Sequence, residues 1–298
     1  MLQAIGAYLL WGLFPFYFPL LKPAGPVEIL AHRFVWTCVL MAIVVTIIGG
    51  WRRIRAMSRK TFLVVAAAAV FISVNWGVYV YAVNTNQVAE AALGYFINPL
   101  VSVALGVVFL KETLTRLQTV SVLLATIAVI ILTISIGTPP IIALSLAFSF
   151  GFYGLLKKQV NLSSAESLMA ESAIITPLAI AYLVWLQTKG TSTFLSEGPS
   201  HMGLLMFAGV ATALPLLLFG IGAKKIPLST IGLIQYITPC MQMIIAVVIN
   251  KEQLEPARWA GYIIIWVAVV LFVADILISM RKRRKLRTEE LTQVRVEE

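Results

Sequence analysis

Charged side chains are scarce in this sequence, and their scarcity excludes an ordinary soluble domain. Asp, Glu, Lys and Arg together make up 12% of the 298 residues, whereas hydrophobic residues make up 60%. Soluble globular proteins carry about a quarter charged residues. The composition is therefore that of a protein that spends most of its length in a lipid bilayer.

Cysteine and histidine are nearly absent, which argues against a disulfide framework, a metal site or a cofactor. Cys38 and Cys240 both lie in apolar runs, where single cysteines behave as small hydrophobic residues. Neither His32 nor His201 belongs to an H-E-x-x-H zinc motif, and the G-x-x-x-x-G-K-[ST] and G-x-S-x-G motifs are missing as well. We therefore expect no catalytic residue, no metal, no cofactor and no ATP-driven pump; the chain is not expected to be an enzyme.

Long apolar runs, in contrast, recur along the whole chain. Each has about the 20 residues that a helix needs to cross a hydrocarbon core about 30 Å thick. None alternates apolar and polar residues as a membrane β-strand does. The chain opens on such a run without a basic segment or a cleavage site, so we expect a retained helix rather than a signal peptide. We predict an all-α polytopic membrane protein with ten transmembrane helices, at 3–21, 28–48, 62–83, 88–109, 118–136, 140–156, 167–187, 202–222, 227–249 and 257–279.

The basic residues gather in alternate links between these helices, and this bias predicts the topology. Cytoplasmic links are enriched in Lys and Arg. With the N-terminus inside, most of the 23 basic residues fall on the inner side. We therefore expect a multi-pass protein of the plasma (inner) membrane with both termini cytoplasmic. The basic tail at 281–298 faces anionic lipid headgroups, so the net charge of +10 predicts no nucleic-acid partner; the oligomeric state stays open.

One sequence pattern occurs twice. "GYFINPLVSVALGVVFLKE" (94–112) and "IQYITPCMQMIIAVVINKE" (234–252) share six identities in 19 positions at an offset of 140 residues, including Pro, Lys and Glu. Apolar helices resemble one another by composition alone, but ungapped matches at these residue types are harder to explain in that way. The offset spans five helices, and an odd number inverts the second copy. We predict two inverted five-helix repeats, at 1–137 and 138–280, which are typical of secondary transporters.

These features resemble one known family of transporters. The motifs that carry the resemblance are "EILAHR" (28–33), "NW" (75–76), "AVN" (82–84), "GYFINPL" (94–100), "AFSFGFYGLLKK" (147–158), "LSTIGLIQYITP" (228–239) and "IIIWVAVVLFVAD" (263–275). Together they resemble the drug/metabolite transporter superfamily with two EamA-type repeats, and within it the RarD branch. The resemblance covers nearly the whole chain. It implies ten helices, cytoplasmic termini and the export or exchange of small molecules, but it does not supply a substrate.

Two helices with an internal proline occupy matching positions in the predicted halves. Pro99 in the helix at 88–109 and Pro239 in the helix at 227–249 each remove a helical hydrogen bond and free a backbone carbonyl. Interrupted helices at corresponding positions of two halves are the best sequence indication of a transporter site. The residues that we predict to contact substrate here are Tyr95, Asn98, Gln235, Tyr236 and Thr238.

These polar residues also have a structural explanation. Small and polar side chains let membrane helices approach closely and form hydrogen bonds across the contact. Polar groups in the middle of a membrane helix are nevertheless costly and commonly functional. We favour a cavity for the helix at 227–249 and leave Asn98 undecided between packing and cavity.

Further candidates lie on the first three helices. Arg33 lies about a turn and a half into its apolar run, where an unpaired guanidinium is expensive. Its partner is either another side chain or an anionic or zwitterionic ligand, and Glu28 lies too near the outer surface to be the only choice. Aromatic residues suit flat organic cargo, although they also fill ordinary helix contacts. The remaining candidates are Trp11, Asn75, Trp76 and Tyr79, with Pro15 as a helix kink like Pro99 and Pro239.

Glu90 and His32 are the candidate proton carriers, and each has a simpler explanation. Asn86 is a plausible N-cap, which places Glu90 in the opening turn, where a carboxylate favours the helix dipole. A histidine titrates near neutral pH, but a lone one more often satisfies a local hydrogen bond. We favour the structural explanation and keep proton coupling as the alternative.

The sequence therefore predicts a secondary transporter that moves a small organic metabolite or drug-like solute across the plasma membrane by alternating access, with export as the expected direction. Two alternatives stay open. A non-transporting scaffold or sensor subunit needs no cavity at the middle of the membrane. A membrane-embedded enzyme needs a titratable cluster, for which the 13 acidic residues give little material.

Overall fold

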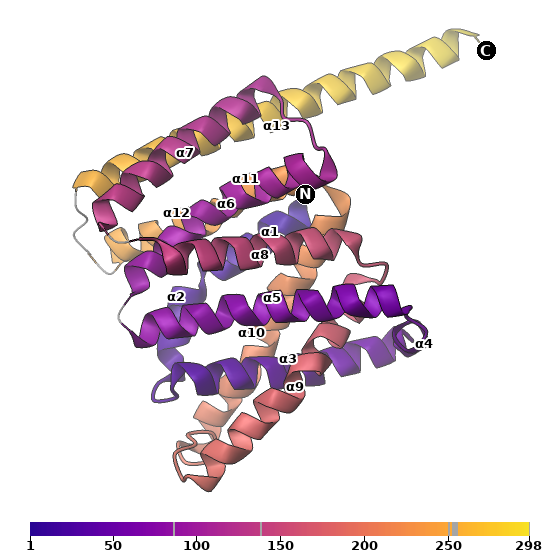
Figure 1. Cartoon of the computed structure of the whole chain (residues 1–298). Coiled ribbons are helices and arrows are strands. Elements are labelled where there is room, and N and C mark those ends of the chain that lie inside the picture. Colours follow the sequence, from indigo (N-terminus) through magenta and orange to yellow (C-terminus); the bar gives the residue numbers. More distant parts are fainter. Residues whose placement is uncertain (86, 138, 250, 252–255, 298) are drawn as a thin grey trace.

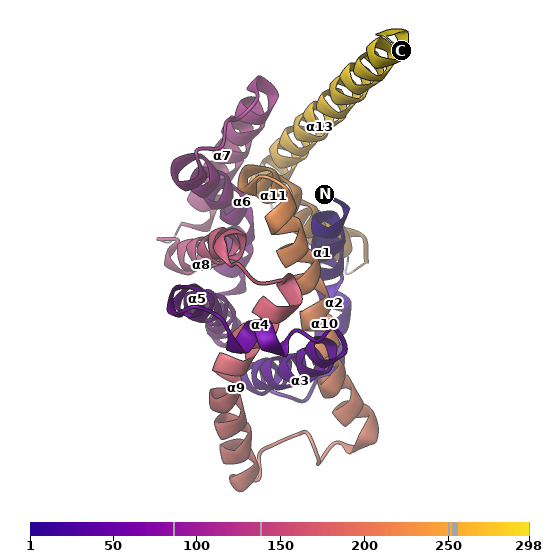
Figure 2. The ribbon, with the colours of Figure 1, turned by 90° about the vertical axis from the view of Figure 1, so that its right-hand side faces the viewer.

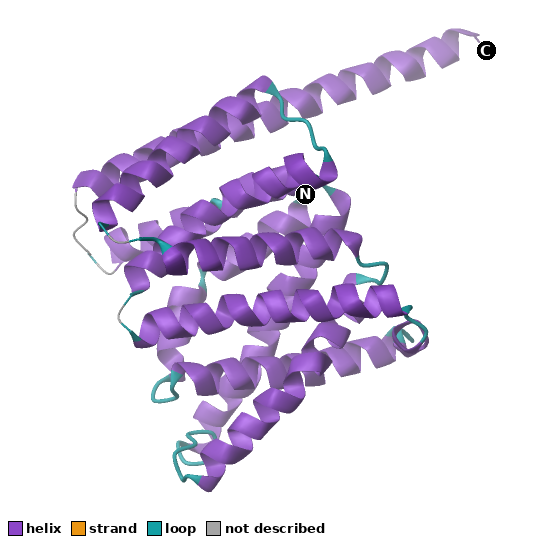
Figure 3. Cartoon of the chain, in the orientation of Figure 1, coloured by secondary structure: helices purple, strands orange, loops and turns teal. Residues whose placement is uncertain are grey.

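The structure is a computed structural model, and it describes residues 1–85, 87–137, 139–249, 251 and 256–297. Within these residues ten helices are long and apolar enough to span a membrane, which confirms the predicted all-α architecture. Figure 3 shows helices joined by loops in the part of the chain that is described. The elements are α1 (Leu2–Gly12), α2 (Phe14–Tyr17), η1 (Phe18–Leu21), α3 (Pro26–Ile47), α4 (Trp51–Arg55), α5 (Arg59–Asn84), α6 (Val88–Leu110), α7 (Arg116–Ile136), α8 (Ile141–Gln159), α9 (Ser164–Thr188), α10 (Gly198–Lys225), α11 (Leu228–Gln235), α12 (Ile237–Ile244), η2 (Ile245–Ile249) and α13 (Pro256–Glu297).

Capping residues fix where several helices begin. Thr115 before α7 and Ser163 before α9 each form a capping box, in which the hydroxyl accepts from the backbone three residues on. The reciprocal bonds come from Gln118 and Glu166. Each box satisfies two backbone N–H groups that a helix otherwise leaves without partners.

The long helices lie roughly side by side and reverse direction from one to the next (Figure 1). The N-terminus, α4 and the C-terminal part of α13 lie at the same end of the bundle, which faces the viewer in Figure 2. We call it the basic end, because α4 and the last turns of α8 and α10 carry Lys and Arg there. The charge pattern predicts that this end is cytoplasmic.

Two of the spans are broken near their prolines. The first passes from α1 to α2 at Leu13, two residues before Pro15, and the ninth passes from α11 to α12 at Tyr236, three residues before Pro239. A proline has no N–H to donate to the preceding turn, so the helix loses a bond at these points. Around Pro99, in contrast, α6 continues as one helix.

The two helices that carry the repeated pattern pack directly on each other. A Cβ atom on Gly232 of α11 would lie 2.6 Å from the carbonyl oxygen of Pro99 and 2.9 Å from Cβ of Ser102, so only glycine permits this approach. The hydroxyl of Tyr236 donates to the carbonyl of Phe96 over 3.2 Å. The contact of α6 with α11 therefore joins the two predicted halves.

Candidate functional site

A cavity of about 850 Å³ lies among helices of both predicted halves. Its size falls within the range of small-molecule sites. Its walls come from α1, α2, η1, α3, α5, α6, α8, α11 and α12. Among the residues predicted from sequence, those that line it are Trp11, Arg33, Asn75, Trp76, Tyr79, Tyr95, Asn98, Gln235 and Thr238, together with Pro15 and Pro239. Their role in binding stays a prediction.

Residues at equivalent positions of the repeat face the same cavity. Tyr95 and Gln235 are 140 residues apart, and so are Asn98 and Thr238. The first of each pair lies on α6, and the second lies on α11 or α12. Both copies of the repeated pattern thus contribute residues from equivalent positions to the lining of one cavity.

Arg33 is buried in the cavity wall without a carboxylate partner among the residues that the structure describes. Its Nε donates to Oγ1 of Thr212 over 2.9 Å, and its guanidinium carbon lies 3.9 Å from the centroid of the Trp76 ring. In the part of the chain that the structure describes, the ion pairs within 4.0 Å join other residues. Glu28, which the sequence suggests as one partner, accepts instead from the backbone N–H and hydroxyl of Thr193, over 2.8 and 3.0 Å.

The cavity's amide side chains differ in how fully they are bonded. Asn75 donates to the carbonyl of Leu146 over 2.8 Å and to the hydroxyl of Ser149 over 3.1 Å, so α8 fixes its orientation. Asn98 is only 2% exposed, yet its Oδ1 has no hydrogen-bond partner among the described residues. A buried acceptor without a donor is costly. Asn98 therefore has unused bonding capacity at the cavity.

Three of the predicted binding or proton-carrying residues, and the predicted kink residue Pro99, lie away from the cavity lining. Tyr236 is fully buried behind it, where its hydroxyl holds α11 against α6. His32 accepts from the indole N–H of Trp36 over 3.2 Å, which is the local hydrogen bond that the simpler explanation predicts. Glu90 lies in the first turn of α6, whose N-cap is Gln87, while the expected cap Asn86 lies outside the described residues.

A buried ionic cluster that the sequence did not predict lies toward the basic end; it is built around Lys157 and Glu171. Lys157, which the basic pattern places at the cytoplasmic surface, is fully buried instead. Its Nζ lies 2.7 Å from Oε1 of Glu171 and donates to the hydroxyl of Ser167 over 2.9 Å. The hydroxyl of Tyr153 donates to the other carboxylate oxygen over 3.2 Å. The available signal is the spacing of Ser167 and Glu171, which lie four residues apart and so share one face of a membrane-spanning helix.

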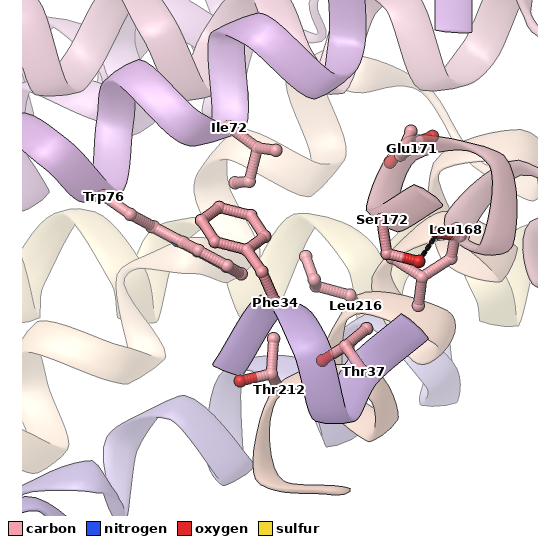
Figure 4. A pocket seen from close by; sticks show the side chains of 9 residues that line it. All are labelled: Phe34, Thr37, Ile72, Trp76, Leu168, Glu171, Ser172, Thr212 and Leu216. Carbon is pink, nitrogen blue, oxygen red and sulfur yellow. Dashed lines mark hydrogen bonds between the residues drawn. The ribbon is translucent and has the colours of Figure 1, made fainter. Parts of the chain in front are cut away.

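A small void separates this cluster from the central cavity (Figure 4). It holds about 10 Å³, roughly the space of a single water. Trp76, which also lines the large cavity, and Phe34 lie on one side of it, while Glu171 and Ser172 lie on the other. Thr212, the partner of Arg33, lines it as well. The space between Trp76 and Glu171 therefore holds no more than about one water.

Glu112 forms a second group of polar contacts at the basic end, at the start of α11. Its two carboxylate oxygens accept from the backbone N–H groups of Leu228 and Ser229 over 2.7 and 2.8 Å, and from the hydroxyl of Ser229 over 2.7 Å. The Nζ atom of Lys158 lies 3.8 Å from the same carboxylate. An acidic group is favourable at a helix N-terminus, so Glu112 ties the end of α6 to the start of α11. The lining of the cavity, in contrast, extends to the link at 22–26, at the opposite end of α3 from α4.

Comparisons with known proteins agree with this architecture. The sequence profile of the EamA-like transporter family matches the chain twice, over residues 1–134 and 138–274. Protein RarD of Streptomyces exfoliatus is 46% identical over 286 residues, which cover 95% of this chain and 91% of that protein. The uncharacterized transporter YojE of Bacillus subtilis (strain 168) is 43% identical, with 89% and 90% covered. Protein RarD of Escherichia coli (strain K12) is 37% identical, with 95% and 97% covered.

A solved structure titled "Crystal structure of protein" has a similar fold. It superimposes with a TM-score of 0.69, covering 91% of this chain and 96% of that one, at 15% sequence identity. At this identity the likeness concerns the fold alone.

Proposed function

Since this chain belongs to the EamA-like transporter family, and within it to the RarD branch, we propose that it is a secondary carrier that moves a small organic solute through the central cavity by alternating access. Family membership makes the chain a multi-pass membrane transporter rather than an enzyme. The mechanism, the cargo and the direction are the steps that we add.

The observation that carries the proposal is the cavity, which residues from both predicted halves line, and we infer that it is closed at the basic end. An alternating-access carrier needs a site near the middle of the membrane that is open to one side at a time. Here the lining reaches the link at 22–26, while Glu112 and the Lys157 cluster lie between the cavity and the basic end. A scaffold or sensor subunit has no need of such a cavity, so its size favours the carrier.

The orientation follows from the basic residues. With the basic end in the cytoplasm, as the positive-inside rule favours, both termini are cytoplasmic and this conformation is open to the outside of the plasma membrane. We propose that the halves 1–137 and 138–280 are inverted repeats whose rocking opens the basic end in turn. Export is the direction that we expect.

Labelling of one cavity residue from each side of the membrane tests the proposal without knowledge of the cargo. In a chain with Cys38 and Cys240 replaced by Ser, Gln235→Cys places a single thiol in the cavity wall. A membrane-impermeant maleimide is expected to label it in right-side-out and, more slowly, in inside-out vesicles. Labelling from the outside alone, with the same protein denatured as the control for reactivity, would contradict alternating access.

Glu112→Ala is expected to open the basic end more often. The substitution leaves the N-terminus of α11 without its carboxylate, and loss of a helix cap costs about 0.5–2 kcal/mol. If that free energy holds the closed state, labelling of Gln235→Cys in inside-out vesicles should become about 2- to 30-fold faster, by the conversion of 1.4 kcal/mol per factor of ten. Ser229→Ala is the matched control, because it removes only one of the three bonds, and its rate should stay near that of the parent. Equal rates for Glu112→Ala and the parent would rule out this role.

A further inference from the structure

The charges around the central cavity have one sign. Lys22 and Arg33 line it, whereas its described lining residues include no Asp or Glu. Arg33 is 9% exposed, and none of the described carboxylates lies within 4.0 Å of it. A buried guanidinium in a membrane protein normally faces a partner of opposite charge. The cavity therefore favours an anion over a cation.

The contacts that Arg33 does make leave most of its donors available. A guanidinium has five N–H groups arranged as a fork that fits a carboxylate. The protein acceptor that the structure gives it is the hydroxyl of Thr212, which bonds to Nε. Trp76 covers the flat face of the group at 3.9 Å and holds it in place through a cation–π contact, but accepts no hydrogen bond.

Aromatic rings surround this cation on several sides of the cavity. Phe14 and Phe18 have their ring centroids 5.8 and 5.7 Å from the guanidinium carbon. Tyr79 and Tyr95 line the same cavity, with their rings 6.1 Å apart. Aromatic faces and edges pack favourably against other rings, so a flat aromatic body next to the acidic group fits this wall.

Asn98 adds a requirement for a hydrogen-bond donor. Its Oδ1 is buried and has no partner among the described residues, although the residue lines the cavity. A solute with a hydroxyl, an amine or a ring N–H would satisfy this acceptor and remove the cost of leaving it unbonded.

We propose that the cargo is an aromatic carboxylate that carries a hydrogen-bond donor: its carboxylate pairs with Arg33, its ring lies among the aromatic side chains, and its donor bonds to Oδ1 of Asn98. This inference rests on the proposed transport function and names its substrate class. The volume of about 850 Å³ accommodates a solute of one or two rings with room for water.

Four compounds with one ring test two of these requirements, the negative charge and the hydrogen-bond donor. The probes are 4-hydroxyphenylacetate, its neutral amide 4-hydroxyphenylacetamide, the cation tyramine, and phenylacetate, which lacks the donor. Each is added at about 10 mM to the purified protein in detergent at neutral pH, and the midpoint of thermal unfolding is measured. A ligand that binds the folded state stabilises it by RT ln(1 + [L]/Kd), so a weak transport site also responds.

We expect 4-hydroxyphenylacetate to raise the midpoint, the amide and tyramine to leave it unchanged, and phenylacetate to bind about 5- to 10-fold more weakly. Arg33→Gln and Arg33→Lys should both lose the response, because lysine keeps the charge but not the fork. Asn98→Ala should bind 4-hydroxyphenylacetate and phenylacetate equally. Arg52→Gln removes an arginine from the exposed surface of α4 and should respond as the parent does.

The substrate class is wrong if the amide or tyramine stabilises the protein as much as the acid, if the acid gives no shift, or if the shift survives in Arg33→Gln. These outcomes leave the carrier mechanism untouched, since the labelling of Gln235→Cys tests it separately. The converse result is also distinguishable. If the thiol is labelled from one side only and the protein still binds the acid through Arg33, the proposed transport function is wrong and the anion site is supported.

Discussion

Replacing Lys157 with methionine is expected to destabilise the folded protein by about 3–5 kcal/mol, the cost of breaking a buried ion pair from one side. The Nζ atom of Lys157 lies 2.7 Å from the carboxylate of Glu171, and the two residues are 0% and 2% exposed. Without the ammonium, the donors left to the carboxylate among the described residues are the hydroxyls of Ser167 and Tyr153. Unfolding of the purified protein in a series of SDS mole fractions measures the loss.

Three further variants separate charge from packing: Glu171→Met, its combination with Lys157→Met, and Arg53→Ala. In Lys157→Met with Glu171→Met both charges are gone, and apolar side chains of similar size often replace a buried pair at little cost. The double variant should therefore be more stable than the sum of the single losses implies, by about 1–3 kcal/mol. Arg53→Ala, which breaks the pair between an arginine side chain that is 71% exposed and Glu166, should cost at most about 1 kcal/mol. Fully additive losses for Lys157 and Glu171 would contradict the ion-pair account.

The spans of this fold could be predicted from sequence because the bilayer imposes a simple requirement. About 20 apolar residues are needed for each crossing, and the predicted helix at 28–48 corresponds to a span at Pro26–Ile47. The spans predicted at 167–187 and 202–222 leave a longer link than the structure has, since α9 reaches Thr188 and α10 begins at Gly198. Polar residues at the ends of helices read as loop in a sequence, and only capping geometry places the boundary.

The candidate site could be predicted in part, because buried polar and aromatic residues stand out in an apolar chain. Arg33 and Asn98 were conspicuous for that reason, and the structure places both at one cavity. Tyr236 looked equivalent, but whether a side chain on α11 faces the cavity or α6 depends on how the helices are rotated, which the sequence does not fix. Its hydroxyl turns to Phe96 instead.

The buried ionic cluster of Lys157 and Glu171 shows why the rest of the site could not be predicted from sequence. A lysine at the last turn of an apolar helix reads as a surface marker, and Lys158, its neighbour, is partly exposed as expected. The partner that buries Lys157 is 14 residues further along, on the next helix. Only the packing of α8 against its neighbours brings the two charges together. The sequence around either residue does not show that Lys157 and Glu171 will pair.

Gly209→Ala is expected to have the second large effect, because α10 and α3 touch there through backbone. A Cβ atom at position 209 would lie 2.5 Å from the carbonyl carbon of Trp36 and 2.6 Å from its oxygen. Real contacts of this kind do not occur, so the two helices must move apart. Overpacking typically costs about 1–3 kcal/mol, and a clash with rigid backbone should reach the upper part of this range. Thermal unfolding in detergent measures the change.

The same variant is expected to weaken the binding of 4-hydroxyphenylacetate, because the hydrogen bond from Arg33 to Thr212 crosses the same interface between α3 and α10. Gly203→Ala is the matched control in α10: a Cβ atom there meets nothing within 4 Å, and alanine is favoured over glycine in a helix by about 0.5–1 kcal/mol. It should be at least as stable as the parent and bind as well. Equal results for Gly209→Ala and Gly203→Ala in both measurements would contradict this account. The close contact of α3 with α10 would then not set the position of the Arg33 side chain in the cavity.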